Sequence, residues 1–212
     1  MEDRRSRQRQ AALACKEVDI WSASQTQARP DWGVAKCFVY PLDSKVPDFL
    51  VKFTRSPSKW LLEPEGRNQQ FAFNALRTQQ QPAAQQGLIV CVPELFRAFE
   101  YRGCYFLVME FVPGKTLGQI LKEDDHKGEG QVGHSILYKH IAEGIRLLSA
   151  KAPPGSKPGP VGGGIIRHPF FNDFEAATPY RDIKMLEAHL NNVSMVPHVS
   201  VINSFPPQST TR

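Results

Sequence analysis

An almost unbroken apolar run at residues 104–112 constrains the fold of this chain more than any other segment, because only Glu110 interrupts it. A run of this length and composition is typical of a β-strand that is buried on both faces. Two further segments, 34–40 and 47–53, also have the composition of strands. Turn-forming residues separate them, so the two are predicted to form a hairpin. The first half of the chain is therefore expected to build an antiparallel sheet.

A helix is predicted after the hairpin, with Pro64 suited to its first position and Glu65 close to its start. Glu65 has the spacing that places it on one helix face with Ala72 and Leu76. Its carboxylate is therefore expected to face the core, where a charge needs a cationic partner. Lys52, on the preceding strand, is the expected partner.

Three later segments have clear local signals. Residues 116–119 have the sequence of a capping box that opens a short helix. Residues 135–150 and 179–191 have the apolar spacing of amphipathic helices. Residues 152–164 are rich in Pro and Gly and are predicted to form an exposed linker.

Composition excludes several classes of protein. Of the 212 residues 41% are hydrophobic, which is enough for a core, and no apolar run approaches the length of a membrane span. The four cysteines lack the spacing of a zinc site, and the N-terminus lacks the apolar core of a signal peptide. A cytoplasmic protein with neither metal nor membrane partner is expected. Part of the net charge of +5 lies in the arginines of residues 1–15, which are expected to be a disordered basic tail.

The order of lysine strand, glutamate helix, hairpin, apolar strand and capped helix resembles the small lobe of the protein-kinase-like superfamily. Within it, the chain is similar to the aminoglycoside phosphotransferase branch. The resemblance spans roughly residues 34–192 and is carried by 49–52 (FLVK), Glu65, 92–100 (VPELFRAFE), 105–117 (YFLVMEFVPGKTL), Leu121, 167–173 (RHPFFND) and 186–191 (LEAHLN).

The resemblance implies an α+β fold in two parts. A kinase-like small lobe, with an antiparallel sheet plus one helix, is expected at residues 16–113. An incomplete, mainly helical second lobe is expected at 114–192, and it contains the Pro/Gly linker at 152–164. Residues 193–212 lose all periodicity and are expected to be a disordered tail.

The resemblance also implies an ATP site. Lys52 would hold the phosphates and Glu65 would orient Lys52 by a charge-assisted hydrogen bond. Met109 would lie at the back of the pocket, and the backbone of Glu110 and Val112 would meet the adenine edge. Full-length relatives transfer the γ-phosphoryl group of ATP to a small-molecule acceptor.

The sequence departs from the family in two places. Gly33 is the only glycine before Lys52, although a phosphate-covering loop is usually rich in glycine. The catalytic Asp and the Mg²⁺ ligands are not found: residues 180–184 (YRDIK) resemble a catalytic loop, but Glu187 stands where Asn is needed and no Asp follows Asp182. We therefore expect a chain truncated before the catalytic loop, with no catalytic residues and no phosphotransfer activity.

Other interpretations of these residues stay open. Lys52 can be an ordinary strand lysine, and Glu65 can act on the helix dipole or be replaced by Glu63 as the partner of Lys52. The chain as a whole can be a non-catalytic nucleotide-binding or protein-interaction pseudokinase module. Binding of nucleic acid by the basic tail is not expected, because no aromatic or glycine residues interleave its arginines.

Overall fold

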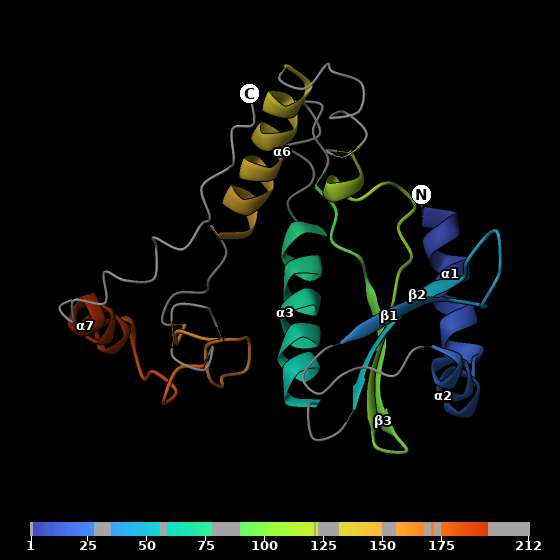
Figure 1. The fold of residues 1–212 in the computed structure, drawn as a ribbon, viewed down its shortest axis with the longest axis horizontal. Helices are drawn as coiled ribbons and strands as arrows, with labels where there is room; N and C mark the ends of the chain where they lie inside the picture. The colour runs from blue at the N-terminus through green and yellow to red at the C-terminus, as the bar shows by residue number, and fades with distance from the viewer. Residues whose placement is uncertain are drawn as a thin grey trace, which may run out of the picture. The chain divides into compact units, whose positions relative to one another are not determined.

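The computed structural model describes residues 2–27, 35–55, 59–77, 90–120, 122, 132–149, 156–167, 171 and 175–194. Its helices and strands, in chain order, are α1 (Glu2–Ala14), α2 (Glu17–Thr26), β1 (Lys36–Tyr40), β2 (Phe49–Arg55), α3 (Lys59–Arg77), β3 (Leu95–Tyr101), β4 (Cys104–Met109), α6 (Val132–Ser149) and α7 (Ile183–Ser194) (Figure 1). Helices thus combine with an antiparallel sheet, which confirms the α+β class. No helix in the described ranges is both long and apolar enough to cross a lipid bilayer.

The sheet has four antiparallel strands in the order β1-β2-β4-β3. β4 lies between two neighbours, and its residues Phe106, Leu107 and Val108 are fully buried. The strand predicted at 104–112 is therefore confirmed as a strand covered on both faces, although it ends earlier, at Met109. Beyond Met109 the chain leaves the sheet after one last bond, from the Glu110 N–H to the carbonyl of Glu94 (2.8 Å).

Each face of the sheet is covered by different helices (Figure 1). One face is aromatic, with Phe53 stacked on Phe106, and it packs against the buried Ala12 and Ile20 of α1 and α2. On the opposite face the core consists of Leu62 from α3 together with Leu107 and Met109 from β4. Side chains alternate between the faces along each strand, so both cores share the same backbone.

The expectation of a disordered tail at residues 1–15 is wrong, because residues 2–14 form helix α1 and this helix packs on the sheet. The residues that face the rest of the protein are Arg5, Gln8, Arg9 and Ala12, at the i, i+3, i+4 and i+7 spacing of one helix face. Most of this face is polar and its partners are carboxylates and backbone groups. The helix therefore has no apolar periodicity for a sequence pattern to detect.

Helix α3 begins at Lys59, upstream of the predicted start at Pro64. Pro64 consequently lies inside the helix, where it cannot donate the hydrogen bond that a backbone N–H at this position makes to the preceding turn. The predicted core-facing position of Glu65 is independent of the start and is described with the site below.

Hydrogen-bonding side chains define the starts of two other helices. The capping box is confirmed, since the Thr116 N–H donates to Gln119 Oε1 (2.7 Å) and the Gln119 N–H donates to Thr116 Oγ1 (3.2 Å). Helix α7 begins at Ile183 and not at Pro179, because Asp182 accepts a bond from the N–H of Met185 (2.9 Å) and acts as the N-cap. Its backbone and side-chain hydrogen bonds lower the pKa of Asp182.

The chain divides into two compact units. One unit contains Met1–Pro154 with Pro160–Gly162, and the other contains Gly155–Gly159 with Gly163–Arg212. Helix α6 therefore belongs to the unit of the sheet. In the second unit Tyr180 is buried, and its hydroxyl lies 2.8 Å from Nδ1 of His189 on α7.

The predicted linker and tail are only partly described. Residues 156–164 contain turns and bends but no helix or strand, as their Pro and Gly content predicts. The backbone of Val161 in this segment is nevertheless tied to α3, since its N–H donates to Asn68 Oδ1 (2.8 Å) and its carbonyl accepts from Arg67 Nε (2.7 Å). Residues 152–155 of the linker and 195–212 of the predicted tail lie outside the described residues.

Candidate functional site

Lys52 and Glu65 form a bidentate ion pair between β2 and α3. The Nζ atom of Lys52 lies 2.7 Å from each carboxylate oxygen of Glu65, and the two side chains are 26% and 40% exposed. The predicted pairing is confirmed. Glu63 is not the partner of Lys52, because it pairs with Arg67 on its own helix (2.9 Å).

A glycine next to Glu65 allows the helix to lie close to the sheet. A Cβ atom at Gly66 would come within 2.9 Å of Cδ2 of Leu107, which is shorter than real contacts of this kind. Leu107 is directly opposite Lys52 in the β2–β4 register. The approach of α3 at Gly66 therefore brings Glu65 within reach of Lys52. Sequence reasoning missed Gly66, although a glycine within a helical run was a usable signal.

The same sheet face carries a thiol beside the ion pair. Cys37 on β1 is directly opposite Lys52, so the two side chains are neighbours on one face. Burial raises the pKa of the Cys37 thiol, while the charges of Lys52 and Glu65 act on this pKa in opposite directions. The cysteine residue is nonetheless exposed to solvent. It gives a natural chemical probe for this face.

The remaining predicted binding residues lie at the end of β4 and just after it. Met109 is buried on the face that carries Lys52, and its sulfur lies 3.6 Å from Gln69 Nε2. Glu110 and Val112 belong to the connector, our name for residues 110–112, which leaves the sheet. Val112 is 53% exposed. The structure thus brings Lys52, Glu65 and Met109 to one face and places the other two in the segment that follows.

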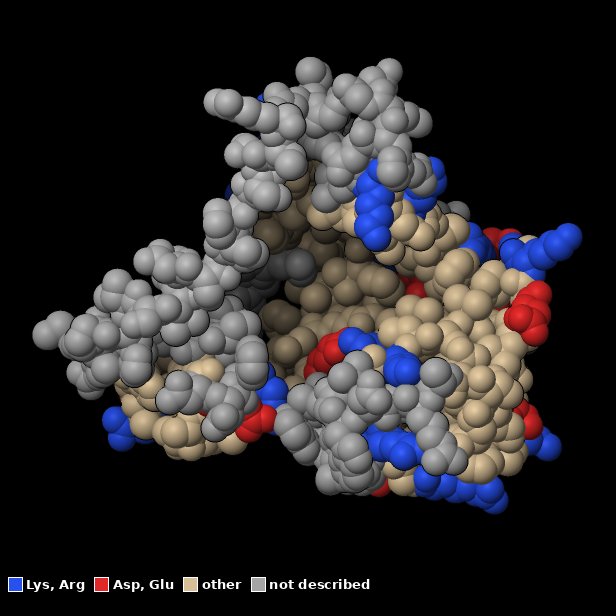
Figure 2. Space-filling model, in the orientation of Figure 1, with Lys and Arg blue, Asp and Glu red and all other residues tan. Residues whose placement is uncertain are grey.

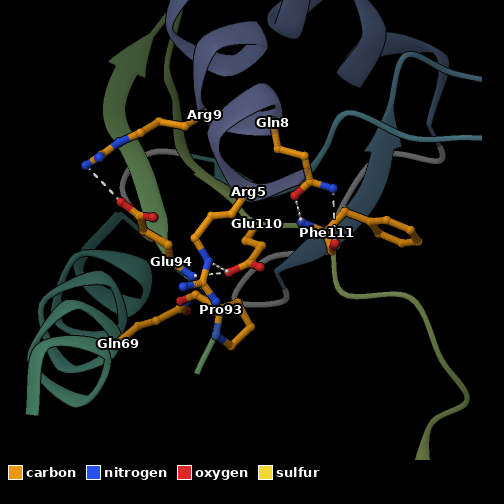
Figure 3. Close-up of polar contacts among 8 residues, drawn as sticks. All are labelled: Arg5, Gln8, Arg9, Gln69, Pro93, Glu94, Glu110 and Phe111. Atoms are coloured by element: carbon orange, nitrogen blue, oxygen red, sulfur yellow. Dashed lines mark hydrogen bonds and ion pairs between the residues drawn. The ribbon is translucent and has the colours of Figure 1, made fainter. Parts of the chain in front are cut away.

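Helix α1 binds the backbone in the middle of the connector through hydrogen bonds of one side chain (Figure 3). The Phe111 N–H donates to Oε1 of Gln8 and the Phe111 carbonyl accepts from Nε2 of Gln8, both at 3.2 Å. Within the described part of the chain, neither the carbonyl of Glu110 nor the N–H of Val112 has a hydrogen-bond partner. These groups belong to the two residues whose backbone the family resemblance assigns to the adenine edge.

Two carboxylates near the connector are neutralised by arginines of α1 (Figure 3). Glu110 pairs with Arg5 (2.9 Å) and Glu94 pairs with Arg9 (2.8 Å). The Glu110 side chain also accepts a bond from the Glu94 N–H (3.2 Å). The side chain of Glu110 therefore has a structural role that the sequence did not reveal. The spacing of residues 5, 8 and 9 was the only available signal.

Other parts of the described surface provide weaker candidates for a functional site. A shallow recess is lined by Arg5, Phe73, Leu76, Arg77, Cys91 and Val92, and none of the predicted binding residues lines it. In the described ranges no group of three or more His, Cys, Asp or Glu side chains could hold a metal ion. Lysines and arginines are scattered over the face drawn in Figure 2 and do not form one continuous basic patch.

Comparison with known proteins identifies no relative: no protein-family model matches the chain, and no curated protein or solved structure is significantly similar to it.

Proposed function

We propose that residues 16–113 are the nucleotide-binding lobe of an ATP-dependent, kinase-like small-molecule phosphotransferase of the aminoglycoside phosphotransferase type. We also propose that this chain binds ATP without transferring its phosphoryl group. The observation that carries the proposal is the bidentate Lys52–Glu65 pair, held between a sheet and the helix that covers it. In this account Lys52 contacts the phosphates, Met109 lies behind the adenine, and the Glu110 carbonyl and Val112 N–H meet the adenine edge.

The chemistry of the pair supports this assignment. A lysine ammonium has three N–H donors, and the two bonds to Glu65 leave one for a phosphate oxygen. Glu65 also fixes the position of a long flexible side chain, which lowers the entropy lost when a phosphate binds. Surface ion pairs contribute only about 0–1 kcal/mol to stability, and this pair is half-buried. In the proposal its fixed geometry prepares Lys52 for a ligand.

The proposal that transfer does not occur rests on the residues around Asp182. This residue is the aspartate of the segment that resembles a catalytic loop, yet it caps α7 through the N–H of Met185. A catalytic aspartate must instead orient the acceptor hydroxyl from a loop next to the bound metal. Asp182 is thus committed to helix initiation.

A second candidate function is a protein-interaction module, and helix α6 supports it. Tyr138, Ile141 and Ile145 share one face of this helix, and they are 53%, 36% and 60% exposed. Apolar side chains gathered on one exposed face are a common feature of interaction surfaces. A module of this kind would use the fold and need no nucleotide.

Thermal unfolding of the full chain with ATP, with and without Mg²⁺, tests the proposal. Saturating ATP should raise the unfolding temperature of the wild type, because a ligand that binds only the folded state stabilises it. Lys52→Ala should abolish the shift, and Lys45→Ala, which removes an exposed lysine from the β1–β2 turn, should preserve it. An unchanged melting temperature in the wild type would favour the interaction module. Phosphotransfer to water or an acceptor above background would contradict the proposed inactivity.

A further inference from the structure

The polar face of α1 makes an unusual set of contacts for a helix that begins at the second residue of the chain. Arg5, Gln8 and Arg9 all contact residues far away in the sequence, in the connector and just before β3 (Figure 3). Gln8 is almost completely buried, although it is polar. A buried amide is stable only when its hydrogen bonds are made, and Gln8 makes them with both backbone groups of Phe111.

The carboxylates beneath α1 require its arginines. Glu94 and Glu110 are joined by reciprocal bonds: the Glu110 N–H donates to the Glu94 carbonyl and the Glu94 N–H donates to the Glu110 carboxylate. Their side chains are only 7% and 14% exposed. A poorly solvated carboxylate is costly unless a cation accompanies it. Each carboxylate has an ion pair with one arginine of α1.

We propose that α1 is an intramolecular clasp on the connector, that Gln8 is the positioning residue of this clasp, and that docking of α1 is coupled to nucleotide binding at the same segment. The clasp is independent of the proposed function, whereas the coupling rests on it. Gln8 holds the N–H and carbonyl of Phe111, so the backbone on either side of Phe111 cannot rotate freely while α1 is docked.

Release of the clasp would let the connector sample other conformations. The Glu110 carbonyl and Val112 N–H would then adopt the arrangement that matches an adenine edge for only part of the time. Apparent affinity falls in proportion to the fraction of molecules in the competent conformation. Any event that undocks α1 should therefore weaken nucleotide binding indirectly, with no change in the residues that contact the nucleotide.

The test uses the full chain and the variant Gln8→Ala, with Gln10→Ala as the matched control, because Gln10 is an exposed glutamine of the same helix. Hydrogen exchange of the Phe111 amide, followed by NMR, reports the clasp, and an ATP titration reports the coupling. Loss of the Gln8 bonds should speed exchange at Phe111 about tenfold and weaken ATP binding about three- to tenfold. Gln10→Ala should change neither.

Each outcome decides one part of the proposal. Unchanged exchange at Phe111 in Gln8→Ala would overturn the clasp. Faster exchange with unchanged ATP affinity would overturn the coupling. A wild type that does not bind ATP would contradict both the proposed function and the coupling, while exchange at Phe111 would still decide the clasp. Gln8→Asn, which withdraws the amide by one methylene, replaces Gln8→Ala if that variant does not fold.

Discussion

Substitution of Ala12 by aspartate tests whether α1 is docked. Ala12 is fully buried between α1 and the aromatic face of the sheet. Arg97 is close, but it already donates to the carbonyls of Ala12 (3.3 Å) and Cys15 (2.7 Å) and pairs with Glu17 (3.1 Å). A carboxylate at this position would therefore be buried without a partner of its own. An uncompensated buried charge costs about 3–5 kcal/mol.

The chain can avoid most of this cost by releasing α1, since the four strands of the sheet pair with one another and not with this helix. Trypsin cleaves after arginine, and the cleavage rate follows the population of the open form when opening and closing are fast. A loss of about 3 kcal/mol in docking free energy corresponds to cleavage that is about a hundredfold faster. Limited proteolysis with mass spectrometry should show this at Arg5 and Arg9.

Gln10→Asp is the control, because it adds the same charge to the exposed side of the same helix and should leave the cleavage rate almost unchanged. The cleavage rate of the wild type can refute the docked position of α1. If trypsin cuts the wild type after Arg5 and Arg9 as fast as it cuts Ala12→Asp, residues 2–14 are a loose tail in solution and the docked helix is wrong.

Three other predictions concern the sheet and its surroundings. Phe106→Ala removes a fully buried ring that stacks on Phe53 and Phe99, with ring centroids 5.8 and 5.1 Å away. It should lower the free energy of unfolding, measured by urea titration, by about 3–5 kcal/mol. A loss below about 1 kcal/mol would contradict the described core. Gly66→Leu should push α3 away from Leu107 and cost about 1–3 kcal/mol, with weaker ATP binding, and an unchanged stability would contradict the close approach. Burial, followed by the hydrogen bond with Cys15, raises the pKa of Tyr40 to about 12. The contribution of Tyr40 to stability is therefore complete below its ordinary pKa of about 10 and is lost as the pH rises towards 12. Ultraviolet titration should show a phenol with a pKa of about 12, and Tyr40→Phe should remove this titration.

Local sequence patterns predicted two kinds of element: those marked by a run or spacing of apolar residues, and those that begin with a capping motif. The run around Phe106 is apolar on both faces because β4 is the central strand, and the capping box at Thr116 needs only residues within one turn. The Lys52–Glu65 pair was predictable for a related reason. A carboxylate on the core face of a helix needs a cation, and the preceding strand offered one.

The sequence did not reveal α1, because its inward face is recognised by partners distant in the chain. In the sequence, Arg5 and Arg9 are typical of a solvated tail. Only the fold shows that they pair with Glu110 and Glu94. Gly66 was overlooked for a similar reason, since its importance lies in the side chain of Leu107 across the helix–sheet contact. Both contacts join residues that are far apart in the sequence, so the periodicity of apolar residues could not reveal them.

Protection of Cys37 by ATP is the most direct test of the proposed nucleotide site. Cys37 is exposed and directly opposite Lys52 on the sheet face of the proposed site. Alkylation of each cysteine in the full chain can be followed by mass spectrometry of its peptides. We predict that ATP slows alkylation of Cys37, and that Lys52→Met removes the protection. Equal rates at Cys37 with and without saturating ATP would contradict a nucleotide site on this face.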